Sequence, residues 1–130
     1  MKILVVDDDA IVVKSCKRIL EAEGFEVSSV SSADQALEAI KKYEFDLLLI
    51  DVKMPKHDGF FLMGEMKKEA PEMPVVVMSG YPTPETIAEV RKSGAIQFIS
   101  KPFRPDELIK TIHQVIQKIP AKRSFPTGAG

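Results

Sequence analysis

Short apolar runs alternate along the chain with longer segments of mixed character. Three of these runs, residues 3–6, 47–50 and 75–78, contain no polar residue and are rich in Ile, Leu and Val. Runs of this kind are typical of strands covered on both faces, as in the centre of a parallel sheet. Residues 25–30 and 97–100 form weaker runs with polar residues inside them, so we expect them to be edge strands.

The segments between the runs carry apolar residues at helical spacing. Apolar positions recur every three or four residues, which predicts amphipathic helices. These stripes cover residues 12–20, 33–40, 62–66, 87–90 and 108–119. Gly24 and Gly94 are expected to stop the first and fourth helices. Ser31 or Ser32 is placed to cap the second helix, and Thr83 to cap the fourth.

Strands that alternate with helices predict the α/β class, with a parallel sheet, right-handed crossovers and helices on both faces. In such sheets a site forms where loops leave the carboxyl ends of the strands. The chain after residue 119 has no periodicity but contains several Pro and Gly residues. We therefore divide the chain into one domain over 1–119 and a linker or frayed tail over 120–130.

Composition narrows the function classes. The chain has 130 residues and a formal net charge of −1, which argues against a dedicated nucleic-acid or membrane-surface binder. Its one cysteine cannot form an internal disulfide. No apolar run approaches the ~20 residues that span a bilayer, and no signal-peptide core precedes Asp7. A cytoplasmic single domain is the resulting expectation.

Polar side chains stand where four of the five expected strands end. They are Asp7, Asp8 and Asp9 after the first strand, Asp51 after the third, Ser79 after the fourth and Lys101 after the fifth. Parallel strands bring these ends to one edge of the sheet, where crowded carboxylates repel unless a cation joins them. Mg²⁺ is a suitable cation, because it takes oxygen ligands and keeps waters that a phosphate can replace. An aspartate can also attack phosphorus, and a lysine can neutralise the transferred group.

At this point the sequence resembles the receiver domain of bacterial two-component response regulators. The segments that carry the resemblance are VVDDD at 5–9, DVKMP at 51–55, DG at 58–59, MSG at 78–80 and KPF at 101–103. They occur in the family's order and spacing, and the resemblance covers about residues 1–119. It implies a flavodoxin-like (βα)5 doubly wound sandwich, whose five parallel strands follow the order 2-1-3-4-5.

The resemblance also implies roles for the acidic residues. Asp51 matches the aspartate that accepts the phosphoryl group. Asp8 matches the acid that binds Mg²⁺ directly, and Asp7 its partner, which acts largely through water. Lys53 stands where the family uses a backbone carbonyl as a further metal ligand.

Three further positions match functional residues of the family, and two of them, Ser79 and Phe98, match its switch. Lys101 matches the lysine that is typical of the family's phosphorylation site. It precedes Pro102, and we expect the peptide bond between them to be cis. Ser79 matches the switch hydroxyl. Phe98 matches the aromatic switch residue; plain core packing is the alternative, and the two roles are not exclusive.

The implied function is a phosphorylation-dependent switch. A sensor histidine kinase or a phosphotransfer protein donates a phosphoryl group from phosphohistidine to Asp51. Ser79 then moves inward, Phe98 fills the vacated space, and the face of the fourth helix, fifth strand and fifth helix changes. This face would control a partner, an output domain after residue 120 or a homodimer that forms on phosphorylation. The domain itself is expected to bind neither nucleic acid nor membrane, and to catalyse only its own phosphotransfer and slow autodephosphorylation.

Other functions with an acidic Mg²⁺ site fit less well. A phosphatase of the haloacid-dehalogenase type also uses an aspartate nucleophile, but it needs a second acid two residues later, where this chain has Lys53. A flavodoxin-type carrier would share the fold, but it needs a phosphate-cradling loop where this chain has three aspartates. Within the receiver interpretation, Lys53 and Tyr81 are candidates for tuning how fast water reaches the phosphoryl group.

Several conspicuous residues have ordinary structural interpretations. Asp9 is expected to cap the first helix. Cys16, on an apolar helical face, is expected to be an inert buried residue. His57 is expected to face solvent, with a modulating role near Asp51 as the alternative. Phe61, if exposed, could mark a contact surface, although single exposed apolar residues are normal.

Overall fold

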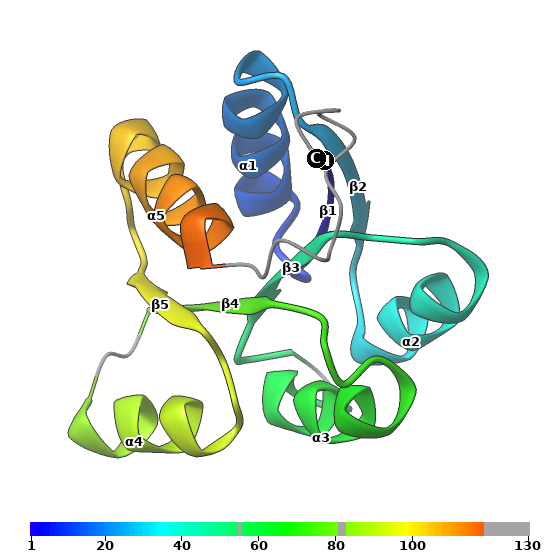
Figure 1. The fold of residues 1–130 in the computed structure, drawn as a ribbon. Coiled ribbons are helices and arrows are strands. Elements are labelled where there is room, and N and C mark those ends of the chain that lie inside the picture. The colour runs from blue at the N-terminus through cyan, green and yellow to red at the C-terminus, as the bar shows by residue number, and fades with distance from the viewer. Residues whose placement is uncertain (55, 81–82, 119–130) are drawn as a thin grey trace.

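A parallel sheet of five strands forms the middle layer of the molecule (Figure 1). The computed structural model describes residues 1–54, 56–80 and 83–118, so Tyr81 and the proposed tail over 120–130 lie outside the described residues. The strands are β1 (Lys2–Val6), β2 (Glu26–Val30), β3 (Leu47–Asp51), β4 (Val75–Ser79) and β5 (Gln97–Ser100). Their order is β2-β1-β3-β4-β5, which confirms the predicted fold class and strand order.

Helices cover both faces of this sheet. On one face lie α1 (Ala10–Ala22) and α5 (Pro105–Lys118). On the other lie α2 (Ala33–Lys42), α3 (Gly59–Glu69) and α4 (Pro84–Lys92) (Figure 1). Within the part of the chain that the structure describes, no helix is long and apolar enough to cross a membrane.

The sheet separates two hydrophobic cores, because successive side chains of a strand point to opposite faces. Ile3 and Val5 of β1 pack in the core under α1 and α5. Leu4 and Val6 pack in the core under α2, α3 and α4. Every residue of β3 and β4 is buried, whereas β2 and β5 at the edges are partly exposed. The distinction between central and edge strands is therefore confirmed.

Cys16 belongs to the core under α1 and α5, and its side chain is fully buried. Burial, together with the negative charge of Asp7, raises the pKa of the Cys16 thiol to about 12. The predicted burial of Cys16 is thus confirmed, and a thiol with so high a pKa is a poor nucleophile near neutral pH.

Side-chain caps fix where four of the helices begin. The Asp9 carboxylate accepts a hydrogen bond from the Ile11 amide at 2.9 Å, which confirms its predicted capping role. Ser32, rather than Ser31, caps α2, and Thr83 caps α4 as predicted. Asp58 caps α3, a role that the sequence interpretation did not assign to it.

Candidate functional site

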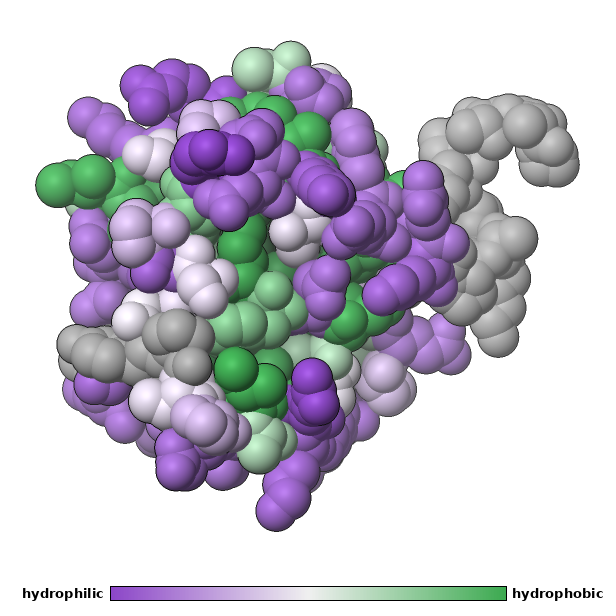
Figure 2. All heavy atoms as spheres, turned by 90° about the vertical axis from the view of Figure 1, so that its left-hand side faces the viewer, coloured by the Kyte–Doolittle hydropathy of each residue, from purple (hydrophilic) through white to green (hydrophobic). Residues whose placement is uncertain are grey.

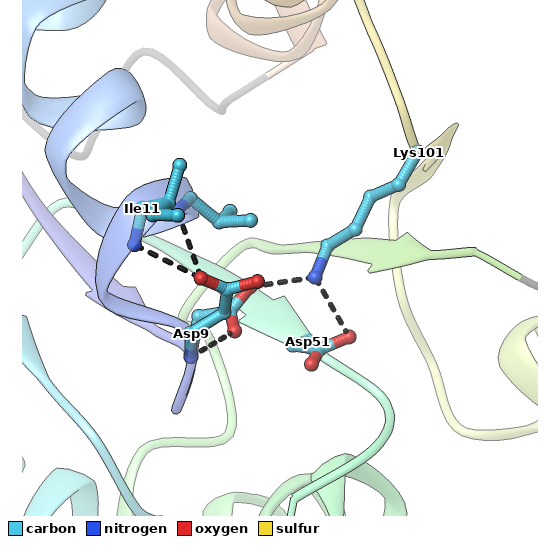
Figure 3. A network of polar contacts seen from close by, with 6 residues as sticks. Asp9, Ile11, Asp51 and Lys101 are labelled. Atoms are coloured by element: carbon cyan, nitrogen blue, oxygen red, sulfur yellow. Dashed lines mark hydrogen bonds and ion pairs between the residues drawn. The ribbon is translucent and has the colours of Figure 1, made fainter.

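Charged side chains from three different strand ends meet at the carboxyl edge of the sheet. Asp7 follows β1, Asp51 is the last residue of β3, and Lys101 follows β5. The Lys101 Nζ donates a hydrogen bond to Asp7 Oδ2 at 2.7 Å and lies 3.4 Å from Asp51 Oδ1 (Figure 3). Asp7 is 1% exposed and Asp51 7% exposed, so this lysine joins two carboxylates that are largely shielded from water.

The backbone holds both ends of the ion pair between Lys101 and Asp7 in place. The Lys101 amide donates to the Ser79 carbonyl at 2.8 Å, which fixes the start of the β5–α5 loop against the end of β4. The Lys101–Pro102 peptide bond is cis, as predicted. The second oxygen of Asp7, Oδ1, accepts a hydrogen bond from the Asp9 amide at 2.9 Å. The orientation of the Asp7 carboxylate is therefore determined from both sides.

Gly59, the first residue of α3, lies directly against Asp51. A Cβ atom built on Gly59 would lie only 2.6 Å from the Asp51 carbonyl oxygen and 3.1 Å from Val52 Cα. The Gly59 amide donates to the Val52 carbonyl at 2.8 Å and closes the base of the β3–α3 loop. A glycine is thus required for close backbone approach, which gives a physical reason for the DG segment at 58–59.

Three carboxylates form an all-oxygen cluster at this edge. One carboxylate oxygen from each of Asp7, Asp8 and Asp51 lies within 4.8 Å of the others. Asp8 is exposed, whereas the other two are buried, so the cluster opens to solvent on one side. Oxygen donors with an open side fit a hard divalent cation such as Mg²⁺, which retains several water ligands. Asp7, Asp8 and Asp51 thus form an acidic site of a kind that suits Mg²⁺.

The electrostatics of the cluster reflect its crowding. Burial, reinforced by the negative charge of Asp7, raises the pKa of Asp51 to about 6. Lys101 and the backbone amide of Lys53, which hydrogen-bonds to the Asp51 carboxylate, act in the opposite direction. Burial also works against the charge on Lys101, but its contacts with Asp7 and Asp51 outweigh this and raise the pKa of Lys101 above its usual value. The lysine therefore stays charged, while Asp51 is held in an unfavourable ionised state.

Ser79 and Phe98 lie on neighbouring strands on the same side of the sheet. Val77 of β4 pairs with Phe98 of β5, and both pack in the core under α2, α3 and α4. Ser79 lies two residues after Val77, so its side chain points to the same face. Ser79 is buried and Phe98 is partly buried. The hydroxyl at the end of β4 and an aromatic ring on the neighbouring strand thus lie on the same side of the sheet.

His57 makes two contacts that the sequence interpretation missed. We expected it to face solvent, and its side chain is 46% exposed. However, its Nδ1 lies 3.1 Å from Asp34 Oδ1 at the start of α2, and its ring stacks on Phe61 of α3 with centroids 3.9 Å apart. The spacing of 23 residues between Asp34 and His57 follows no helical or strand period, so no local signal could have revealed this pair.

Comparison with known proteins decides the family. Residues 3–113 match the family model for the response regulator receiver domain. The chain belongs to this family. A receiver domain of a CheY-like protein from Methanospirillum hungatei superposes with a TM-score of 0.87 and is 33% identical, over 95% of this chain and 98% of that one. NtrX from Brucella abortus, crystallised with ADP, has a TM-score of 0.87 and 37% identity over 94% of this chain and 28% of its own.

Curated relatives are longer than this chain. The transcriptional regulatory protein ZraR of Escherichia coli is 37% identical over 114 residues, which are 88% of this chain and 26% of ZraR. The chain therefore spans about a quarter of the length of that relative. As a receiver domain it is a phosphorylation-dependent switch, a signalling module and not an enzyme. The haloacid-dehalogenase alternative is thereby set aside.

Proposed function

We propose that Asp51 accepts a phosphoryl group from the phosphohistidine of a sensor histidine kinase or a phosphotransfer protein. In this step the phosphorus–nitrogen bond breaks, its electron pair stays on the imidazole, and a bond forms between phosphorus and an Asp51 carboxylate oxygen. The observation that carries the proposal is the position of Lys101, whose Nζ lies 3.4 Å from that carboxylate and is held there by Asp7. A fixed ammonium at this point neutralises charge on the transferring group.

The same carboxylates would hold Mg²⁺. We assign Asp8, Asp51 and the backbone carbonyl of Lys53 as direct ligands, and Asp7 as a ligand through water. Bound Mg²⁺ supplies charge neutralisation at the phosphoryl oxygens. Asp7 has a second task in this arrangement, since its hydrogen bond at 2.7 Å orients the Lys101 ammonium toward the cluster. The exposed position of Asp8 leaves a path by which the phosphoryl donor reaches the site.

Ser79 and Phe98 would transmit the phosphorylation of Asp51 to the surface of the domain. The phosphoryl group on Asp51 draws the Ser79 hydroxyl inward, and Phe98 occupies the space that Ser79 leaves. Both side chains lie on the same side of the sheet, on neighbouring strands, which supports a coupled movement of Ser79 and Phe98. The result is a shift of population between two packed states, biased by the added charge.

The surface that would change is the one formed by α4, β5 and α5. Figure 2 looks onto this side of the molecule and shows apolar side chains gathered in a band across its middle, with hydrophilic side chains around it. Partly buried apolar residues of the three elements are Ile87, Phe98, Ile109 and Ile116. An apolar band with a polar surround suits a surface that binds another protein domain.

The proposed partners follow from the length of the relatives. ZraR of Escherichia coli and CtrA of Caulobacter vibrioides are transcriptional regulators, and this chain covers 26% and 51% of them. We therefore propose an output domain that follows residue 120. A homodimer that forms on phosphorylation through the surface of α4, β5 and α5 is a second proposed partner. The receiver itself would bind neither nucleic acid nor membrane, consistent with its net charge of −1. We also propose a cytoplasmic location, where ATP is available to the kinase.

Acetyl phosphate with Mg²⁺ tests phosphotransfer without a kinase. We expect the intact mass of the wild type to rise by one phosphoryl group, and we expect no such rise for Asp51→Asn. Asp46→Asn is the matched control, because Asp46 precedes β3 at the opposite end of the same strand and should leave the modification unchanged. An unmodified wild type, or a modified Asp51→Asn variant, would overturn the proposal.

A further inference from the structure

A side chain of the loop between β3 and α3, His57, contacts helix α2 through Asp34. We propose that His57 is a positioning residue, which holds this loop, and with it the Lys53 backbone carbonyl, in the arrangement that binds Mg²⁺. This inference rests on the proposed function, in which that carbonyl is a metal ligand. His57 contacts neither Asp51 nor the acidic cluster in any contact of the described residues, so it would act through the loop.

The ends of the loop are already fixed by the backbone. The Val52 amide donates to the Met78 carbonyl at 3.2 Å, which continues the pairing of β3 with β4. At the other end the Asp58 carboxylate caps α3 through the Phe61 amide at 2.9 Å, and Gly59 is closed onto Val52. Lys53 and Met54 follow the first anchor, and Lys56 and His57 precede the second.

Lys56, which precedes His57 in the loop, has an unfavourable backbone conformation. Lys56 has a φ of +67°, in the left-handed region that residues with a Cβ atom rarely adopt. Such a conformation persists only where neighbouring contacts favour it. The next residue is His57, whose contacts with Asp34 and Phe61 supply such a constraint. Without them the loop would relax, and Lys53 would be left with the hydrogen bond of its amide to the Asp51 carboxylate.

The two contacts of His57 constrain its ring in different ways. The ring lies nearly parallel to that of Phe61, at an interplanar angle of 15°, which fixes its plane. The bond of 3.1 Å between Nδ1 and Asp34 Oδ1 fixes its rotation within that plane. Asp34 lies in the first turn of α2, which begins after the Ser32 cap, so the anchor itself belongs to a regular element. The charged residues beside His57 are Lys56 and Asp58 on its loop and Asp34 on α2; from α3 it meets the uncharged Phe61.

Mg²⁺ affinity, measured by isothermal titration calorimetry with MgCl₂, tests the positioning role. We expect His57→Ala and Asp34→Ala each to weaken Mg²⁺ binding about threefold, within the range for one half-exposed hydrogen bond between side chains. The double variant should bind no more weakly than His57→Ala alone, because both substitutions remove the same contact. His57→Arg should restore wild-type affinity, since a guanidinium can pair with Asp34 and stack on Phe61.

His113→Ala is the matched control. His113 is 52% exposed, lies 3.6 Å from Glu23 and makes an edge contact with Phe25, but it belongs to α5 on the other face of the sheet. Its loss should leave Mg²⁺ affinity unchanged. If His57→Ala lowers the stability of the metal-free protein but leaves Mg²⁺ affinity at the wild-type value, the contact is merely structural and the proposal is wrong.

Failure of the proposed function is recognisable separately. A wild type that binds no Mg²⁺ would remove the metal site, and with it this role, before any substitution is made. Where wild type binds, the amide resonances of Lys53 and Met54 give a second measurement in the metal-free protein. We expect them to shift in His57→Ala and to return in His57→Arg, and unshifted resonances would contradict a role through the loop.

Discussion

Asp51 is the residue in which the demands of function and of folding conflict most directly. It is buried at the end of β3, beside a second buried carboxylate, and Lys101 offsets the repulsion only in part. A group with a pKa raised to about 6 stabilises the folded protein below its unfolded pKa of about 3.8 and loses that contribution as the pH rises through 6. Ionisation of Asp51 therefore lowers the free energy of unfolding of the metal-free protein.

Replacing this carboxylate by a neutral amide should therefore stabilise the metal-free protein. We expect Asp51→Asn to raise the free energy of unfolding at pH 7.5 by on the order of 2 kcal/mol, and to have little effect near pH 4. Urea unfolding across this pH range, with a chelator present, measures the difference. A variant less stable than wild type at pH 7.5 would show that attraction to Lys101 outweighs the cost of burial and the repulsion by Asp7.

A second prediction for a single residue concerns the effect of substituting Gly59 on stability. A methyl group there would lie 2.6 Å from the Asp51 carbonyl oxygen, so we expect Gly59→Ala to lower the free energy of unfolding by about 1–3 kcal/mol. Gly64, inside α3, has nothing within 4 Å of the corresponding position. Gly64→Ala should instead stabilise the protein, by about 0.5–1 kcal/mol. Equal effects of the two substitutions in thermal unfolding would contradict this interpretation.

At the scale of the elements, much of the fold was accessible from sequence because its signals are local. Fully apolar runs marked the central strands β1, β3 and β4, and polar residues within the weaker runs marked β2 and β5 as edges. The caps of α1 and α4 could be predicted for the same reason. The Asp58 cap of α3 has a local signal too, but the same residue belongs to the DG segment at 58–59 that carries the family resemblance, so its capping role was not predicted.

The cap of α1 separates Asp9 from its acidic neighbours. Asp9 accepts the Ile11 amide at 2.9 Å, and its own amide donates to Asp7, so its side chain serves the helix rather than the cluster. We expect Asp9→Ala to lower the free energy of unfolding by about 1 kcal/mol, and Asp9→Ser to restore most of it. Phosphorylation by acetyl phosphate should persist in both variants, and its loss in Asp9→Ser would assign Asp9 to the site.

At the scale of the whole molecule, the site exists because parallel strands end at one edge. Asp7, Asp51 and Lys101 are up to 94 residues apart in sequence, yet the order β2-β1-β3-β4-β5 places their strand ends together. This convergence could be predicted, because it depends on topology alone. The contact between His57 and Asp34 could not be predicted from the sequence, because it depends on how α2 and the β3–α3 loop pack against each other.

Mg²⁺ should stabilise the molecule as a whole, because a ligand that binds only the folded state raises the free energy of unfolding. At a concentration one hundred times its Kd the gain is about 2.7 kcal/mol. We expect millimolar Mg²⁺ to raise the Tm of wild type, and to raise the Tm of Asp8→Asn much less. A Tm that is independent of Mg²⁺ in wild type would count against a metal site among the three carboxylates.

The account depends most on Asp51 as the phosphoacceptor. Borohydride reduction after treatment with acetyl phosphate and Mg²⁺ converts an aspartyl phosphate to homoserine, and peptide sequencing by mass spectrometry locates the converted residue. The peptide that covers residues 43–53 contains both Asp46 and Asp51, so the position is resolved within one fragment. We predict conversion at Asp51 alone. Conversion at Asp7, Asp8 or Asp46, with Asp51 unchanged, would contradict the account.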